Sequence, residues 1–157
     1  MKKVLIVMGL ILSLISCKSN SPVGTKLDMK TEVALKGDWI LSQVSYPNSQ
    51  YVKITSFDLV DSNCFVGSKW NFVSNNNKGS FSLTNDACSL YSSSITWYVN
   101  KDGRFVMKIL DAEKAKRVDT GYVLDLNNVT ETTFQLVDYV DVAGKNTAVT
   151  YQFVRNN

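Results

Sequence analysis

The residues of this chain that could do chemistry are few. There are three cysteines, at positions 17, 64 and 88, and no histidine at all. The absence of histidine removes the Ser-His-Asp and Cys-His arrangements of nucleophilic catalysis, and with them the commonest metal ligand. Any enzymatic chemistry would therefore have to rest on carboxylates, lysines or tyrosines.

Four aspartates have spacings that could form a catalytic pair of carboxylates: Asp58, Asp61, Asp138 and Asp141. Paired carboxylates can perform acid–base work when their surroundings separate their pKa values. Such residues are more often strand-end or turn aspartates in contact with water. We therefore expect no enzyme, no cofactor and no metal site, and keep carboxylate catalysis as the alternative.

Cys17 follows a segment typical of a secretory signal. Lys2 and Lys3 precede an apolar run at residues 4–15, which is shorter than the about 20 residues that span a bilayer and has the dimensions of a signal-peptide core. The run ends in Leu-Ile-Ser-Cys at residues 14–17, which resembles the bacterial lipobox. The resemblance implies removal of residues 1–16 and attachment of lipid to Cys17. The alternative is an ordinary secreted protein with a stray cysteine.

Lipid on Cys17 would keep the protein on a membrane, because two or more acyl chains give stable anchoring. Residues 18–21 lack both an aspartate after the cysteine and an acidic cluster, so we expect an outer membrane position facing the periplasm. Residues 17–33 read as the lipidated N-terminus with a flexible tether. Residues 34–157 read as one domain, of a size typical of single domains.

Two further features of the composition limit the function. The formal net charge falls from +3 to +1 when the two signal lysines are removed, so the chain offers no basic footprint for nucleic acid. Cys64 and Cys88 remain as a pair in an oxidising compartment, and we expect a disulfide between them. Two buried free thiols are the alternative.

From residue 37 onward, apolar and polar residues alternate with period two, which indicates half-buried strands. The predicted strands are residues 38–46, 69–73, 80–84, 94–99, 104–110, 122–126, 133–140 and 148–154. Residues 75–79, 101–103 and 143–146 have the composition of tight turns. We expect an all-β fold with eight short strands joined mostly by hairpins, either an up-and-down barrel or a sandwich.

Two segments do not follow this alternation. Residues 50–63 have a mixed apolar pattern that fits a strand or a helical turn, and the charged residues 111–120 fit a short helix or a loop.

An ordered set of motifs resembles the lipocalin-like lipoproteins of Bacteroidota. The set covers roughly residues 35–156 and consists of Gly37-Asp38-Trp39, Trp70-Asn71-Phe72, Ile95-Thr96-Trp97, the C-terminal Tyr151-Gln152-Phe153-Val154-Arg155, and the two cysteines. The resemblance implies an eight-stranded antiparallel up-and-down β-barrel. It also implies that Trp39 lies at the closed end of the barrel beneath Arg155, forming a cation–π pair that is structural.

Assigning the apolar face of each strand to the interior gives a set of twenty inward residues. They are Trp39, Leu41, Trp70, Phe72, Phe81, Leu83, Ile95, Trp97, Val99, Phe105, Met107, Ile109, Tyr122, Leu124, Leu126, Phe134, Leu136, Val149, Tyr151 and Phe153. They could line a ligand cavity or fill the barrel completely, since an eight-stranded barrel has room for one or the other. The number of large side chains favours a filled interior.

These observations predict a membrane-anchored lipocalin-like lipoprotein of the bacterial envelope without enzymatic activity. The resemblance implies that it binds a small lipophilic ligand. The crowded interior instead favours a docking subunit of an outer-membrane protein complex, because a filled barrel still presents its rim and outer wall.

Overall fold

The computed structural model describes residues 29–111 and 117–157, so the predicted signal, Cys17 and most of the tether lie outside the described residues. Eight antiparallel strands form a closed barrel in the order β1-β10-β9-β8-β7-β6-β5-β4, which confirms the predicted fold. The strands are β1 (Gly37–Ser45), β4 (Lys69–Val73), β5 (Lys78–Leu83), β6 (Tyr91–Val99), β7 (Phe105–Asp111), β8 (Tyr122–Asn127), β9 (Thr133–Val142) and β10 (Lys145–Arg155).

The strand register closes the barrel around β1. Trp39 of β1 lies opposite Arg155 of β10 on one side and opposite Trp70 of β4 on the other. Side chains alternate between the two faces of a strand, and β6 follows this rule with Ser93, Ile95, Trp97 and Val99 all buried. One face of every strand therefore points into a shared apolar interior.

Some strand ends differ from the predicted ones. β6 begins at Tyr91 and β10 at Lys145, each three residues earlier than expected. The predicted turn at residues 75–79 is shorter than expected, since Asn77 takes the left-handed conformation and Gly79 lies inside β5. A Cβ atom on Gly79 would lie 2.5 Å from the carbonyl oxygen of Asn71, so glycine is needed there for close strand approach and not for a turn.

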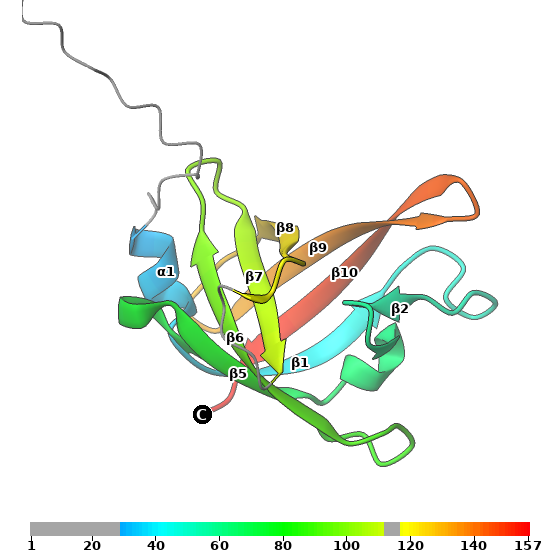
Figure 1. The fold of residues 1–157 in the computed structure, drawn as a ribbon, viewed down its shortest axis with the longest axis horizontal. Helices are drawn as coiled ribbons and strands as arrows, with labels where there is room; N and C mark the ends of the chain where they lie inside the picture. The colour runs from blue at the N-terminus through cyan, green and yellow to red at the C-terminus, as the bar shows by residue number, and fades with distance from the viewer. Residues whose placement is uncertain (1–28, 112–116) are drawn as a thin grey trace, which may run out of the picture.

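A helix that the sequence did not reveal, α1 (Met29–Leu35), covers one end of the barrel (Figure 1). The Oε1 atom of Glu32 accepts a hydrogen bond from the backbone N–H of Val99 at 3.0 Å, and the carbonyl oxygen of Leu35 accepts one from Nε1 of Trp39 at 2.8 Å. Both side chains are buried. The folded domain therefore begins inside the predicted tether of residues 17–33, because these contacts fix its last residues against the barrel.

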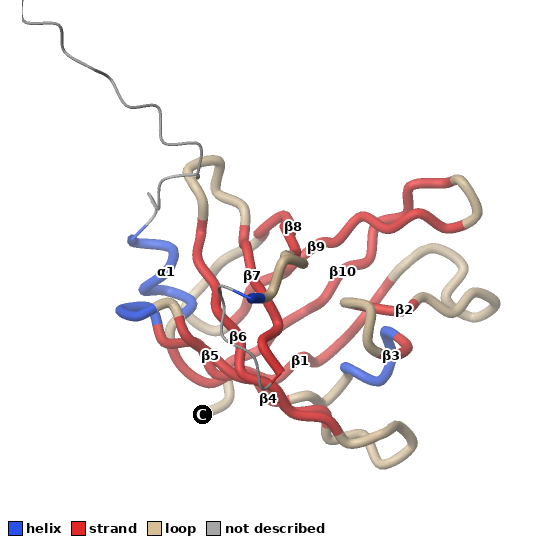
Figure 2. Tube along the Cα trace, in the orientation of Figure 1, coloured by secondary structure: helices blue, strands red, loops and turns tan. Residues whose placement is uncertain are grey.

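At the other end, the β9–β10 hairpin projects beyond the barrel (Figure 1). The segment between β1 and β4 also lies at this end and forms β2 (Thr55–Ser56), β3 (Val60–Asp61) and the 3₁₀ helix η1 (Ser62–Phe65), as Figure 2 shows. The ambiguous residues 50–63 thus form both a short hairpin and part of a helical turn. We call this end of the barrel the mouth and the α1 end the floor.

The second ambiguous segment, residues 111–120, stays mostly undecided, because residues 112–116 lie outside the described residues and residues 118–120 form neither helix nor strand. Within the described ranges, no helix has the length and apolar character needed to cross a membrane.

Candidate functional site

The floor of the barrel is held by Arg155 and Trp39. The Cζ atom of Arg155 lies 4.2 Å from the centre of the Trp39 ring system. The same guanidinium donates three hydrogen bonds to backbone carbonyl oxygens, at 2.9 Å to Ala34, 3.0 Å to Lys36 and 2.6 Å to Glu131. Arg155 thereby joins the end of α1 and the β8–β9 connection to the last strand, which is a structural role.

Above the floor, aromatic rings from the strands pack directly against one another. Phe134 and Phe153 stack with ring centres 4.4 Å apart, and Trp97 and Phe105 stack at 5.6 Å. Phe72 contacts Trp97 edge-on at 5.2 Å. These five side chains are at most 1% exposed. Interiors packed in this way leave few voids larger than a water molecule, so the floor half of the barrel is a core.

The structure places the whole predicted inward set inside the barrel. All of these residues are buried except Ile109, Tyr122 and Leu126, which are partly buried and lie at the edge of the same core. Met107 and Phe81 belong to the buried majority.

The mouth half is filled differently, by residues 54–61 of the β1–β4 connection, which we call the plug. Its Ile54 and Phe57 side chains are both only 5% exposed. The Phe57 ring stacks on Tyr151 at 5.2 Å and contacts Tyr122 edge-on at 5.2 Å and Phe65 of η1 at 5.3 Å. A side chain from a loop thus occupies the position where the strands alone would leave the barrel open.

A buried chain of hydroxyl groups lies beside the Phe57 ring. Oγ of Ser56 is 2.6 Å from the hydroxyl of Tyr151 and 2.6 Å from Oγ of Ser62, which donates to the carbonyl oxygen of Ile54 at 2.7 Å. Ser56 and Ser62 are fully buried. Burial raises the pKa of Tyr151 well above its usual range, so this hydroxyl stays protonated.

The backbone of the plug is bound by Tyr122. The Tyr122 hydroxyl donates to the carbonyl oxygen of Phe57 at 2.8 Å and lies 3.3 Å from Oδ2 of Asp58. Burial, and then the charge of Asp58, raise the pKa of Tyr122 to about 12. Phe57 and Asp58 have φ angles of 53° and 54°, a left-handed conformation that is unfavourable for residues with a side chain.

Of the four aspartates considered for catalysis, Asp58 and Asp138 lie close enough for the charge of Asp58 to act on Asp138. Asp138 pairs across the ladder with the inward Val149. Burial, and next the charge of Asp58, raise the pKa of Asp138 above its usual value. Asp61 caps η1 through the N–H of Asn63 at 2.9 Å, and Asp141 accepts from Gly144 in the hairpin turn. In the described ranges, no group of three or more Cys, Asp or Glu residues is placed to hold a metal ion.

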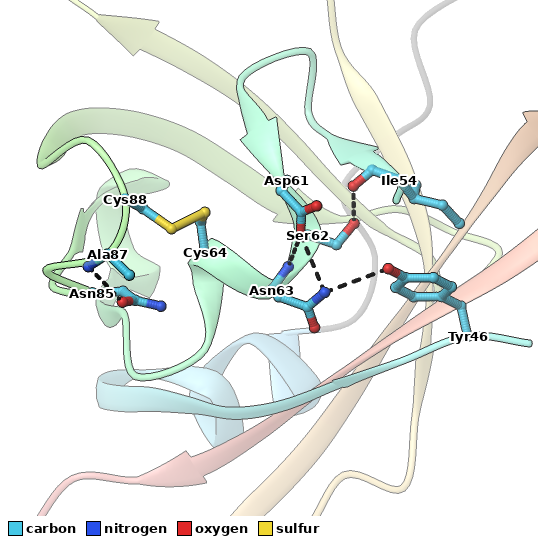
Figure 3. Close-up of a disulfide and its surroundings, with 9 residues drawn as sticks. All are labelled: Tyr46, Ile54, Asp61, Ser62, Asn63, Cys64, Asn85, Ala87 and Cys88. Carbon is cyan, nitrogen blue, oxygen red and sulfur yellow. Dashed lines mark hydrogen bonds between the residues drawn. A yellow bond between two sulfur atoms is a disulfide. The ribbon is translucent and has the colours of Figure 1, made fainter. Parts of the chain in front are cut away.

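The predicted disulfide is confirmed. Cys64 in η1 and Cys88 in the β5–β6 connection are bonded (Figure 3). Just before Cys64, the side-chain amide of Asn63 donates to the Asp61 carboxylate at 3.1 Å and to the hydroxyl of Tyr46 at 3.4 Å. The bond therefore fixes η1, which follows the plug, to a neighbouring hairpin of the barrel.

A polar groove lies outside the barrel, on the outer face of β4, β5 and β6. Its volume is about 530 Å³. Its polar lining residues are Asp38, Lys69, Asn71, Ser80, Ser82, Ser92, Ser93, Ser94, Asp111 and Asn156. A smaller pocket of about 150 Å³ lies at the mouth, between residues 47–54, which include Ile54 of the plug, and the β9–β10 hairpin.

The residues that fill the mouth, Ser56, Phe57, Ser62 and Phe65, were not predicted from the sequence. The only indication in the sequence was that residues 50–63, in a long connection between strands, contain many apolar residues without a regular period. Such density in a loop is itself unusual, since connecting segments normally run over the surface.

The comparisons with known proteins agree with the fold. A family model described as a lipocalin-like domain matches residues 35–137, more than half of the chain. Among curated proteins, none matches the chain.

Solved structures that resemble the chain include bovine odorant-binding protein with a selenium-containing odorant (17% identity, 78% of this chain and 74% of that one, TM-score 0.46). The same protein with undecanal gives 17% identity, 78% and 72% coverage and a TM-score of 0.46. The odorant-binding protein OBP1 gives 14% identity, covers 80% of this chain and 73% of that one, and has a TM-score of 0.45. This likeness is distant, and the barrel is established by its own strand pairing.

Proposed function

We propose that this chain, which belongs to the lipocalin-like domain family, is a non-enzymatic protein that binds a small lipophilic ligand at the mouth of its barrel. The observation that carries the proposal is that the mouth is filled by the plug and not by side chains of the strands. The floor half offers no such space, because its aromatic rings come from the strands themselves.

The plug has the properties of a segment that can leave. It carries two consecutive left-handed residues, Phe57 and Asp58, and such a conformation costs roughly 1–2 kcal/mol per residue. The residues on either side of it also have contacts outside the plug. The hydroxyl of Tyr46 donates to the carbonyl of Val52 at 2.9 Å before the plug, and the disulfide fixes η1 after it. When residues 54–61 move, Ser62 loses the two bonds that its backbone N–H and its Oγ donate to the carbonyl oxygen of Ile54, each 2.7 Å long. The disulfide still holds η1 to the barrel.

The test compares binding of a neutral lipophile, N-phenyl-1-naphthylamine, to the natural chain and to Asp58→Gly. Glycine adopts a positive φ without strain, so this variant should favour the closed plug by about 1 kcal/mol and weaken binding about fivefold, since affinity falls with the open fraction. Equilibrium dialysis of the full chain in detergent, with protein-free detergent as the blank, measures both affinities.

A matched control is Asn48→Gly, which changes another left-handed residue (φ 58°) of the same connection but lies outside the plug. It should leave the affinity unchanged. An absence of saturable one-to-one binding by the natural chain would refute the proposal.

We also propose that Cys17 carries lipid and holds the protein at the outer membrane, facing the periplasm. The lipobox-like sequence at residues 14–17 supports this. Cys17→Ser should abolish palmitate labelling and release the protein from membranes. Continued labelling of the variant would contradict the anchor.

A second candidate function is docking onto an outer-membrane protein, and the polar groove favours it. The groove is large and carries charges of both signs, from Lys69 and from Asp38 and Asp111. Ser80→Arg would place a long, charged side chain in it, whereas Thr150→Arg alters another outward position, on β10. Copurification from membranes in mild detergent should recover a stoichiometric partner that only Ser80→Arg loses. Equal recovery with both variants would exclude the groove as the docking surface.

A further inference from the structure

We propose that the ligand of the mouth is a small, neutral aromatic compound that carries a hydroxyl group. This inference rests on the proposed function, namely that the plug gives way to a ligand. Phe57 supplies an aromatic ring and the adjacent Ser56 supplies a hydroxyl, so the plug itself presents both groups to the barrel. A molecule that replaces the plug must satisfy the same surroundings.

The ring surroundings select an aromatic group. Tyr151 stacks on the Phe57 ring with 27° between the ring planes, while Tyr122 and Phe65 meet it edge-on at 77° and 82°. Stacked and edge-to-face arrangements are favourable for aromatic partners beyond simple burial. Tyr151 and Tyr122 belong to the strands β10 and β8. Phe65 belongs to η1, which the disulfide fixes through Cys64. These three aromatic rings therefore stay in place when residues 54–61 leave.

The residues around the Ser56 hydroxyl favour a polar group of the ligand at that position. When Ser56 leaves, the hydroxyls of Tyr151 and Ser62 lose the partner that each has at 2.6 Å. Buried polar groups without partners are unfavourable. A ligand hydroxyl replaces the two bonds that Ser56 makes, because it can donate to one oxygen and accept from the other. Ser62 also loses the carbonyl oxygen of Ile54 when the plug leaves.

The charge at the mouth disfavours an acid. Asp138 faces inward near Tyr151 and stays in place when the plug moves. The pKa of Tyr151 is raised by burial first and then by the negative charge of Asp138. A fatty-acid carboxylate would meet this like charge in a partly buried site. A neutral hydroxyl group satisfies the same hydrogen bonds without repulsion.

The experiment measures binding of three probes to the full chain by equilibrium dialysis in detergent, with protein-free detergent as the blank. The probes are 2-naphthol, naphthalene, which lacks the hydroxyl, and dodecanoate, which is an aliphatic anion. We expect one-to-one binding of 2-naphthol, about tenfold tighter than naphthalene, and weaker binding of dodecanoate. Phe57→Ala removes the competing ring, so it should bind 2-naphthol more tightly than the natural chain does.

Tyr151→Phe should erase the preference for 2-naphthol over naphthalene. The preference is measured as the ratio of the two affinities in the same variant, so the loss of the bond between Tyr151 and Ser56 of the closed plug affects both probes equally. Tyr139→Phe, which removes an exposed hydroxyl from the outer wall (51% exposed), should keep the preference. Tyr151→Phe is measured alone and also in combination with Phe57→Ala. The single variant gives the answer even where the double variant does not fold.

Two results would overturn the ligand class while leaving the proposed function standing. One is a preference for dodecanoate, and the other is equal binding of 2-naphthol and naphthalene. Failure of the natural chain and of folded Phe57→Ala to bind any probe would overturn the proposed function itself.

Discussion

Replacing Arg155 by methionine should destabilise the domain far more than the same change at Arg104. Arg155 donates to three backbone carbonyls and lies over Trp39. Hydrogen bonds to charged groups contribute about 1.5–3 kcal/mol each, and a cation–π contact contributes about 0.5–2 kcal/mol. Because Arg155 is partly exposed and such terms are not additive, we expect a loss of about 3–4 kcal/mol in the free energy of unfolding.

Arg104 is the matched control, since its guanidinium pairs with Asp125 at 2.8 Å on the surface, where the two side chains are 40% and 37% exposed. Exposed pairs contribute about 0–1 kcal/mol, so Arg104→Met should lose less than about 1 kcal/mol. Urea unfolding of both variants measures the difference. Added salt should reduce only the effect at Arg104, because Arg155 binds neutral carbonyls. Equal losses at the two positions would refute the role assigned to Arg155.

Three further changes test other parts of the fold. Trp97→Ala should lower the unfolding free energy by roughly 3–5 kcal/mol, whereas a loss below about 1 kcal/mol in urea would contradict a packed floor half. Replacing Cys64 and Cys88 together by serine should cost about 3 kcal/mol by the chain-entropy model, and an unchanged urea midpoint would contradict it. The folded pKa of Tyr122, about 12, exceeds the unfolded value of 10.0, so stability falls as pH rises between these values. Tyr122→Phe should flatten that part of the profile, measured by urea unfolding at each pH.

The strands could be predicted because burial on one face imposes a period of two. β4 was predicted to the residue, and β8 and β9 differ from prediction only at their C-terminal ends. The starts of β6 and β10 were missed because serine in one and lysine and asparagine in the other carry little strand signal. They pair nevertheless, since Ser92 and Asn146 lie opposite residues of strands already in the ladder.

The plug and α1 were not predictable for a different reason. α1 has seven residues, too few to show a helical period, and it is stabilised by contacts with strands distant in the sequence, such as that of Glu32 with Val99. Phe57 is buried only because Tyr122 and Tyr151 come to lie beside it. Contacts of this kind depend on the closure of the barrel, which no local pattern contains.

With the proposed lipid on Cys17, the position of α1 bears on which way the barrel faces. α1 begins at Met29, twelve residues after Cys17, and twelve residues span at most about 40–43 Å. With lipid on Cys17, the floor is the side nearest the anchoring bilayer, and the opening with its long hairpin points into the aqueous space. A ligand would then reach the mouth from the aqueous space or from a protein or membrane on that side. It would not come from the leaflet that holds the lipid of Cys17.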